Sequence, residues 1–261
     1  MSDPASPVEA LARRIIEAQG PISLAALMRL ANAGLPESYY QAQQPFGGAG
    51  DFVTAPEISQ MFGELLGLAL ADHWHNIGEP QAVDVTELGP GRGLLMADVL
   101  RIWQRSAPPL YRHGAVTMIE ASPALAQAQA ERLARHTHSV SWARDLPPGS
   151  APILLLANEF FDALPIQQFL RVDGGWRERL DSLDWASRIG KRLAERGGLA
   201  LIVDYASRPG ESSLRGISRH RRAEPLQGLG QIDLSAGVDF AALAGAAEAA
   251  GATTYGPLGQ G

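Results

Sequence analysis

The first residues that suggest chemistry form a glycine-rich turn, ELGPGRG, at residues 87–93. Gly89, Gly91 and Gly93 carry no Cβ, so the backbone there can turn sharply and a ligand can approach it closely. A helix that begins behind such a turn directs backbone N–H groups and the positive end of its dipole at the ligand. The turn therefore predicts a ligand-binding site, with a plain strand-to-helix turn as the alternative.

Two common nucleotide motifs do not match this turn. The dinucleotide fingerprint needs a third small residue, but Leu94 or Met96 stands at that position, which weighs against a nicotinamide-dependent oxidoreductase. A Walker A loop needs Gly-Lys followed by Ser or Thr, whereas Gly190-Lys191 is followed by Arg192. The form E-x-G-x-G-x-G instead resembles the first motif of class I S-adenosylmethionine (AdoMet) methyltransferases.

Two acidic residues accompany the turn. Glu120 lies 27 residues after Gly93, at the end of the next predicted strand. A carboxylate at this place can accept hydrogen bonds from both hydroxyls of a ribose, although a solvated strand-end carboxylate is the alternative. Glu87 is expected either to orient the turn or to meet the amino group of the ligand.

Strands and helices alternate from residue 81 onward. Strands are predicted at 82–88, 115–120, 139–146, 153–160 and 199–206, and helices at 93–105, 123–135, 182–196 and 238–250. Such alternation is typical of right-handed crossovers and of a parallel sheet covered on both faces. The fold class predicted is therefore α/β, with a doubly wound, mostly parallel, Rossmann-like sheet whose ligand lies at the carboxyl ends of the strands.

The chain before residue 79 is expected to form a helical cap. Two short helices are predicted within 8–33, a loop over 36–53 and a longer helix over 57–75, capped by Thr54. The apolar stripe predicted for the longer helix comprises Ile58, Phe62, Leu65, Leu66 and Ala69. We thus expect a cap at 1–78 packed on an AdoMet-binding core at 79–261, with an irregular substrate-side segment at about 207–237.

Several longer blocks resemble the MidA-type methyltransferase family, which includes the mitochondrial complex I assembly methyltransferase. The blocks are GDFVTAPEISQMFGELLG (50–67), ELGPGRGLLMADVLR (87–101), IEASPAL (119–125), ANEFFDALPIQQF (157–169) and DLSAGVDFAAL (233–243). The resemblance implies a class I methyltransferase fold, AdoMet as cofactor and a protein substrate, such as a subunit of a respiratory complex. In the mitochondrial member the methylated group is an arginine guanidinium.

The block after the apolar strand at 153–157 carries the residues expected to act on the methyl acceptor. Methyl transfer is an in-line displacement that mainly requires two reactants to be held in line. A guanidinium is protonated below a pKa of about 12 and needs carboxylates that orient it and accept its proton. Glu159 and Asp162 are the predicted catalytic residues, with solvated carboxylates as the alternative. Asn158 is expected to hold the cofactor's amino-acid end or the acceptor, and Phe160 and Phe161 to exclude water or to lie in the core.

Four further kinds of residue are candidates for the site, although sequence spacing alone does not place them there. The resemblance places Glu57 and Gln60 in a cover near the cofactor, although Glu57 could simply complement a helix dipole. Trp142 and Asp145 follow the third strand, where an adenine contact is common in this fold. Asp204 ends the strand at 199–206 and either faces the same cleft or is structural.

Composition excludes several function classes. The formal net charge is −6, which argues against a nucleic-acid partner. Cysteine is absent, and His73 and His75 diverge on a helix, so no metal site is expected. No run approaches about 18 apolar residues, and no signal or transit peptide is recognised. We therefore expect no membrane association and a cytoplasmic location, while the oligomeric state stays open.

The sequence as a whole predicts an AdoMet-dependent methyltransferase that acts on a protein side chain, with arginine favoured. Two alternatives remain: a methyltransferase of small molecules, and a non-catalytic assembly factor that keeps the methyltransferase fold.

Overall fold

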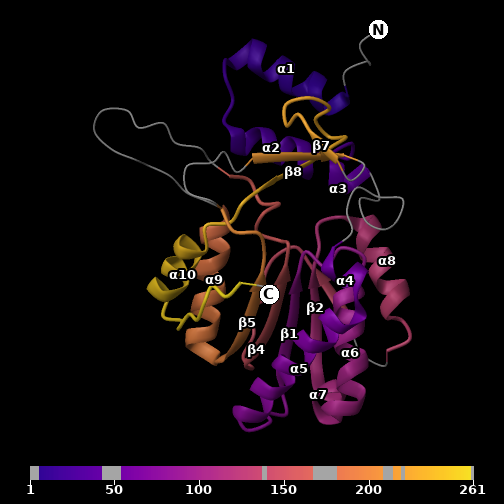
Figure 1. The fold of residues 1–261 in the computed structure, drawn as a ribbon, viewed down its shortest axis with the longest axis vertical. Coiled ribbons are helices and arrows are strands. Elements are labelled where there is room, and N and C mark those ends of the chain that lie inside the picture. The colour runs from indigo at the N-terminus through magenta and orange to yellow at the C-terminus, as the bar shows by residue number, and fades with distance from the viewer. Residues whose placement is uncertain are drawn as a thin grey trace.

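The central element is a five-stranded parallel sheet with the strand order β3-β2-β1-β4-β5 (Figure 1). The computed structural model describes residues 6–42, 54–136, 140–166, 181–207, 214–218 and 221–259. The strands are β1 Val83–Leu88, β2 Gly114–Ile119, β3 Val140–Ala143, β4 Ile153–Asn158 and β5 Gly198–Val203. Every neighbouring pair runs parallel. The chain winds outward from β1 on one side and from β4 on the other, which confirms the predicted doubly wound sheet and places a topological switch point between β1 and β4.

Helices cover both faces of this sheet. On one face α5 (Gln60–Asn76), α6 (Leu94–Ser106) and α7 (Pro108–His113) pack on alternate residues of β1, β2 and β4. On the other face α9 (Asp181–Arg196) and α10 (Phe240–Ala249) cover the remaining residues of β4. Helix α8 (Pro123–Leu133) lies between β2 and β3 along the chain. Because β4 is buried on both faces, its sequence reads as an unbroken apolar run.

The helix predicted over 57–75 is in fact two helices. A short helix α4 (Ala55–Ile58) ends at Ser59, whose extended backbone (φ −146°) separates it from α5. The Ser59 hydroxyl then caps α5 by accepting a hydrogen bond from the Met61 N–H at 3.3 Å. Thr54 stands at the start of α4 but makes no side-chain cap bond.

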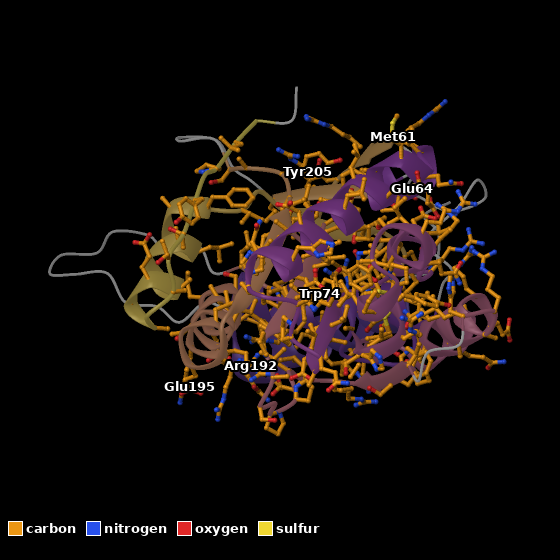
Figure 2. The ribbon with its side chains drawn as sticks, turned by 90° about the horizontal axis from the view of Figure 1, so that it is seen from below. Met61, Glu64, Trp74, Arg192, Glu195 and Tyr205 are labelled. Carbon is orange, nitrogen blue, oxygen red and sulfur yellow. The ribbon has the colours of Figure 1, made fainter. Side chains whose placement is uncertain are left out.

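The apolar stripe predicted for this helix is correct only in part: Phe62 and Leu66 pack against the core, whereas Ile58 and Leu65 do not. Ile58 and Leu65 are 73% and 59% exposed, and Met61 likewise lies at the outer edge of the molecule in Figure 2, whereas Trp74 lies among the side chains of the core. The buried residues of α5 are Gly63, Gly67, Leu70, Ala71 and Trp74. The carbonyl of Gly67 accepts a hydrogen bond from the indole of Trp103 at 2.6 Å. The two glycines, which have no side chain, let α5 approach α6 closely at these positions.

A second unit, which we call the cap, lies above the carboxyl ends of the sheet strands (Figure 1). It comprises α1 (Pro7–Gln19), α2 (Leu24–Asn32), α3 (Tyr39–Ala42) and an antiparallel sheet in the order β7-β6-β8. Its strands are β6 Leu214–Ser218, β7 Arg221–Ala223 and β8 Asp233–Ala236. The two parts share one small core of buried residues, Val8, Ala12, Met28, Ala31, Leu229, Ile232 and Leu234.

The cap corrects the expectation of an irregular segment at 207–237. That segment contains all three strands of the cap sheet, which are three to five residues long and too short to show a clear alternation of apolar and polar residues. The helices at the N-terminus therefore pack on a distant part of the chain. The division of domains at residues 78 and 79 stays a prediction.

Candidate functional site

A cavity of about 560 Å³ lies between the cap and the carboxyl ends of β1 and β4. This is the volume range of sites that enclose a small molecule. The walls come from the glycine turn, the end of β2, the segment after β4, helices α2 and α4, and the start of β8. Its position at the topological switch point is where open α/β sheets bind their ligands.

The predicted glycine turn lines the floor of the cavity. Gly89, Gly91 and Gly93 have φ values of 59°, 52° and 73°, which glycine adopts readily. Gly89 and Gly91 line the cavity. Gly93 does not: it precedes α6, and a Cβ there would lie 3.2 Å from the side chain of Gln129. The third glycine therefore serves packing, while the first two leave room for a ligand.

Glu87 brings a buried carboxyl group to this floor. It is only 3% exposed and lines the cavity. One oxygen accepts the backbone N–H of Met96, whereas Oε2 has no hydrogen-bond partner among the described residues. Burial and the nearby Glu120 raise the pKa of Glu87 to about 8. A buried carboxyl oxygen without a partner fits a donor from a ligand, such as an ammonium group.

Glu120 lies beside the turn, as its place after β2 predicts. Its Oε1 accepts the Ser122 N–H at 2.7 Å, and its Oε2 accepts the Gln129 side chain at 3.1 Å. Burial raises the pKa of Glu120. Gln129, which sequence reasoning missed, also donates to the carbonyl of Gly91 at 2.7 Å and accepts the indole N–H of Trp142. One fully buried amide thus joins Glu120 to the glycine turn.

The structure does not bring the expected adenine contacts to the cavity. The Trp142 indole is engaged by Gln129, and Asp145 forms an ion pair with Arg188 of α9. Neither residue lines the cavity, whereas Arg144, which stands between them in sequence, does. Trp142 is the last residue but one of β3, and its hydrogen bond to Gln129 places its side chain beside α8.

Residues 158–165, which we call the acceptor loop, begin at the last residue of β4 and form one wall of the cavity. Glu159 has a φ of +50°, a conformation uncommon outside glycine. The Asn158 side chain donates a hydrogen bond to Glu159, and Asn158 Oδ1 is buried without a partner among the described residues. Burial, and then the charge of Asp204, raise the pKa of Glu159.

Asp162 lies deeper in the same wall and faces the cap. Burial raises the pKa of Asp162 well above its usual value, with further contributions from Asp204, Asp233 and Glu159. Asp233, the first residue of β8, is 1% exposed, lines the cavity and accepts a hydrogen bond from the hydroxyl of Tyr40. Three carboxyl groups from two distant segments, Glu159, Asp162 and Asp233, therefore meet in the upper half of the cavity.

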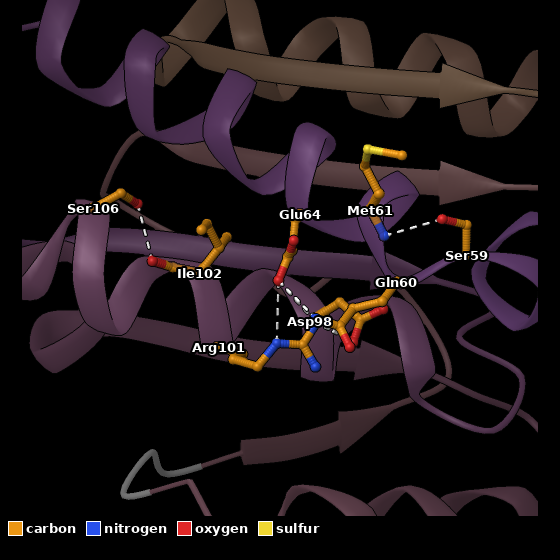
Figure 3. Close-up of polar contacts among 8 residues, drawn as sticks. All are labelled: Ser59, Gln60, Met61, Glu64, Asp98, Arg101, Ile102 and Ser106. Carbon is orange, nitrogen blue, oxygen red and sulfur yellow. Dashed lines mark hydrogen bonds and ion pairs between the residues drawn. The ribbon is translucent and has the colours of Figure 1, made fainter.

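The structure separates the other expected residues. Glu57 of α4 lines the cavity and lies 3.6 Å from Arg92 of the glycine turn. Gln60 does not line it, because the break at Ser59 redirects the chain; its amide donates to Glu64 on the outer side of α5, near Arg101 (Figure 3).

The two aromatic residues of the acceptor loop have different places. Phe160 lines the cavity and makes an edge-to-face contact with Trp185 of α9, with ring centroids 5.4 Å apart. Phe161 is 2% exposed and belongs to the core beneath α9 and α10. Phe161 is therefore a core residue, whereas the exclusion of water by Phe160 stays a prediction. Trp185 itself was not anticipated as a lining residue.

The cavity therefore has two chemically distinct halves. The lower half offers the glycine turn, the unpartnered carboxyl oxygen of Glu87 and the strand-end carboxyl of Glu120. Glu87 fits the ammonium group, and Glu120 the ribose, of a nucleoside that carries an amino-acid side arm. The upper half offers three carboxyl groups, and the charges of Asp233 and Glu159 add to the effect of burial in raising the pKa of Asp162, which favours a cation. Among the described residues, no cluster of His, Asp and Glu could hold a metal ion. The helices of this part of the chain include none with the length and hydrophobicity of a membrane-spanning segment.

Comparisons with known proteins agree with this geometry. A model of a family of S-adenosyl-L-methionine-dependent methyltransferases matches residues 65–184 and 179–258. Among curated relatives, "Protein arginine methyltransferase NDUFAF7, mitochondrial" of Danio rerio is 35% identical over 89% of this chain and 70% of its own length. The Drosophila melanogaster homologue of the same name is 32% identical over 95% of this chain and 72% of its own length.

A solved structure shares the fold. It is a COG1565 superfamily member from Burkholderia thailandensis bound to S-adenosyl-homocysteine, with a TM-score of 0.76 and 23% identity over 96% of this chain and 80% of its own.

These comparisons also correct one expectation and establish the family. The relatives carry names that include the word mitochondrial, which contradicts the expectation of a cytoplasmic location. The chain belongs to the family of S-adenosyl-L-methionine-dependent methyltransferases, and its cofactor is AdoMet.

Proposed function

We propose that the protein transfers a methyl group from AdoMet to the guanidinium of an arginine in a protein substrate. The observation that carries this proposal is the group of three carboxyls, the partly buried Glu159 and Asp162 and the buried Asp233, in the upper half of the cavity. Like charges in one buried site are costly, and a cationic acceptor would relieve the cost. The names of the curated relatives, which are arginine methyltransferases, support the same acceptor.

We assign the lower half of the cavity to the cofactor. Gly89 and Gly91 allow close approach, Glu120 accepts hydrogen bonds from the ribose hydroxyls, and Glu87 accepts one from the amino group. Asn158, whose amide oxygen has no partner among the described residues, holds the amino-acid end. Glu57, held by Arg92, covers the site from α4. AdoMet, when bound here, supplies a methyl group on a sulfonium sulfur that is open to in-line displacement.

The acceptor loop provides the groups that act on the guanidinium. Glu159 and Asp162 orient its planar fork through charge-assisted hydrogen bonds, and Glu159 accepts the proton that the attacking nitrogen loses. The raised pKa of Glu159 makes its carboxylate a better base than an exposed one. Phe160 and Trp185 exclude water beside it. The resemblance to the MidA-type family supports a respiratory-complex subunit as the protein that carries the arginine.

The test is transfer of labelled methyl groups from AdoMet into the proteins of a cell lysate, followed by hydrolysis and identification of the labelled residue. The wild type is expected to label arginine. Glu159→Gln is expected to lose at least about 100-fold in rate while S-adenosylhomocysteine binds within about threefold in calorimetry. The matched control, Glu131→Gln on the exposed side of α8, is expected to behave as wild type. Label in a small molecule, or an unchanged rate in Glu159→Gln, would refute the proposal.

A further inference from the structure

The acceptor loop has a backbone that needs outside support. Glu159 is one of two residues other than glycine with positive φ among the described residues. This conformation is unfavourable for a residue with a Cβ and persists only where the surroundings impose it. Strain of this kind at a functional loop points to a group that holds the loop in place.

The holding group is the carboxylate of Asp204, at the end of the neighbouring strand β5. Its Oδ2 accepts the backbone N–H groups of Phe161 at 3.0 Å and Asp162 at 3.2 Å, and its Oδ1 accepts that of Tyr205 at 2.8 Å. The Glu159 N–H donates to the Val203 carbonyl at 2.9 Å. The first half of the acceptor loop is thus bonded to Val203, the last residue of β5, and to Asp204, which follows it.

Asp204 does not line the cavity, so it reaches the reaction only through the loop. We propose that Asp204 is a positioning residue of the methyl transfer, whose carboxylate holds Glu159 and Asp162 in the orientation that faces the acceptor. This inference rests on the proposed roles of those two residues. The sequence alone favours neither of the two roles of Asp204, a residue that faces the cleft or a structural residue.

Asp204 also shapes the charge of the site. Burial raises the pKa of Asp204 to about 6, against the opposing effect of its backbone hydrogen bonds. After burial, its negative charge is the next cause that raises the pKa values of Glu159 and Asp162 on the acceptor loop. The other charged groups facing this cluster are Asp233 of β8, Glu57 of α4 and Arg215 of β6.

The variant Asp204→Asn keeps the shape of the side chain and removes its charge. We expect the rate of labelled methyl transfer at saturating AdoMet to fall at least about tenfold, because the loop is no longer held for in-line attack. Binding of S-adenosylhomocysteine should stay within about threefold. The acid limb of the pH–rate profile should move to lower pH, because removal of a negative neighbour lowers the pKa values of Glu159 and Asp162. A role in folding alone, without an effect of the Asp204 charge on Glu159 and Asp162, would not move that limb.

A second variant and a control separate charge from position. Asp204→Glu keeps the charge but moves its oxygens, so the rate should fall while the acid limb stays near that of wild type. The control Asp239→Asn changes another aspartate that accepts a backbone N–H, from Ala242 at 3.0 Å, at the start of α10. It should change neither the rate nor the acid limb.

Hydrogen exchange of the acceptor loop provides a readout that needs no acceptor. The amides of Phe161 and Asp162 should exchange at least about tenfold faster in Asp204→Asn than in wild type. Unchanged exchange, or a rate and acid limb equal to those of wild type, would overturn the inference. The identity of the residue labelled by the wild type judges the proposed function, whereas the ratio of variant to wild type and the exchange rates judge Asp204.

Discussion

At the scale of single residues, the turn and the strand ends were predictable, and their partners were not. Glu87 lies at the end of β1, and Gly89 and Gly91 follow that strand. Their convergence with Glu120 and Glu159 results from one rule: parallel strands present their carboxyl ends at one edge. Asp233 belongs to the same cavity but reaches it through the cap, and its partner Tyr40 is 193 residues away in sequence. Asp233 opens one of the blocks quoted from the sequence, yet no spacing argument could place it beside Asp162.

Glu87 makes the stability of the ligand-free protein dependent on pH. Its pKa is raised from 4.5 to about 8, so the folded protein holds this proton more tightly than the unfolded chain does. The resulting stabilisation is complete below pH 4.5 and is lost as the pH rises toward 8. Glu87→Gln should therefore weaken the fall in unfolding free energy between pH 5 and pH 8, and should be more stable than wild type at pH 8 by roughly 1–4 kcal/mol.

Urea unfolding at several pH values without AdoMet measures this effect. Other buried carboxyls, such as Asp162, also contribute to the slope, so the variant should reduce the slope and not abolish it. Glu131→Gln on exposed α8 serves as the control. Parallel curves for Glu87→Gln and wild type would show that Glu87 is not the group responsible.

At the scale of elements, the sheet was predicted well, because central strands such as β4 are apolar throughout. The start and the buried face of α5 were predicted poorly. Leu65, a large apolar residue of α5, faces solvent, while Gly63 and Gly67 lie on the buried face beside Leu70, Ala71 and Trp74. The periodicity of large apolar residues does not identify the glycines of that face. The strands of the cap escaped prediction for a related reason, since three to five residues are too few to establish a period.

The glycines on the buried face of α5 lead to a prediction about stability. A Cβ at Gly67 would lie 2.8 Å from the Ile102 side chain and 3.1 Å from the Val99 backbone of α6. Gly67→Val should therefore reduce the free energy of unfolding by about 1–3 kcal/mol, because the two helices must move apart. Leu65→Ala, on the exposed side of the same helix, should change it by less than about 0.5 kcal/mol. Chemical denaturation measures both; equal effects would contradict this packing.

At the scale of the whole molecule, the cap and the sheet enclose the site between them. Asn32, the last residue of α2, donates to the carbonyl of Ala163 in the acceptor loop at 3.2 Å and to that of Leu234 in β8 at 2.8 Å. One buried amide thus bonds two parts of the cap to the loop that carries Glu159. The sequence predicted a cap from its helices, but the contribution of β6 to β8 arises from contacts across nearly the full length of the chain, which local patterns do not encode.

The central claim is that the turn between β1 and α6 binds the cofactor, and calorimetric titration of AdoMet tests it most directly. Gly91→Val places a branched side chain where the backbone lines the cavity at a φ of 52°. Gly78→Val introduces the same residue at a φ of 88°, with no atom within 4 Å of its Cβ and outside the cavity lining, and serves as the control for backbone strain. The account predicts binding by wild type and Gly78→Val and a loss of at least about 100-fold in affinity in a folded Gly91→Val. Absence of binding by the wild type, or undiminished binding by Gly91→Val, would contradict it.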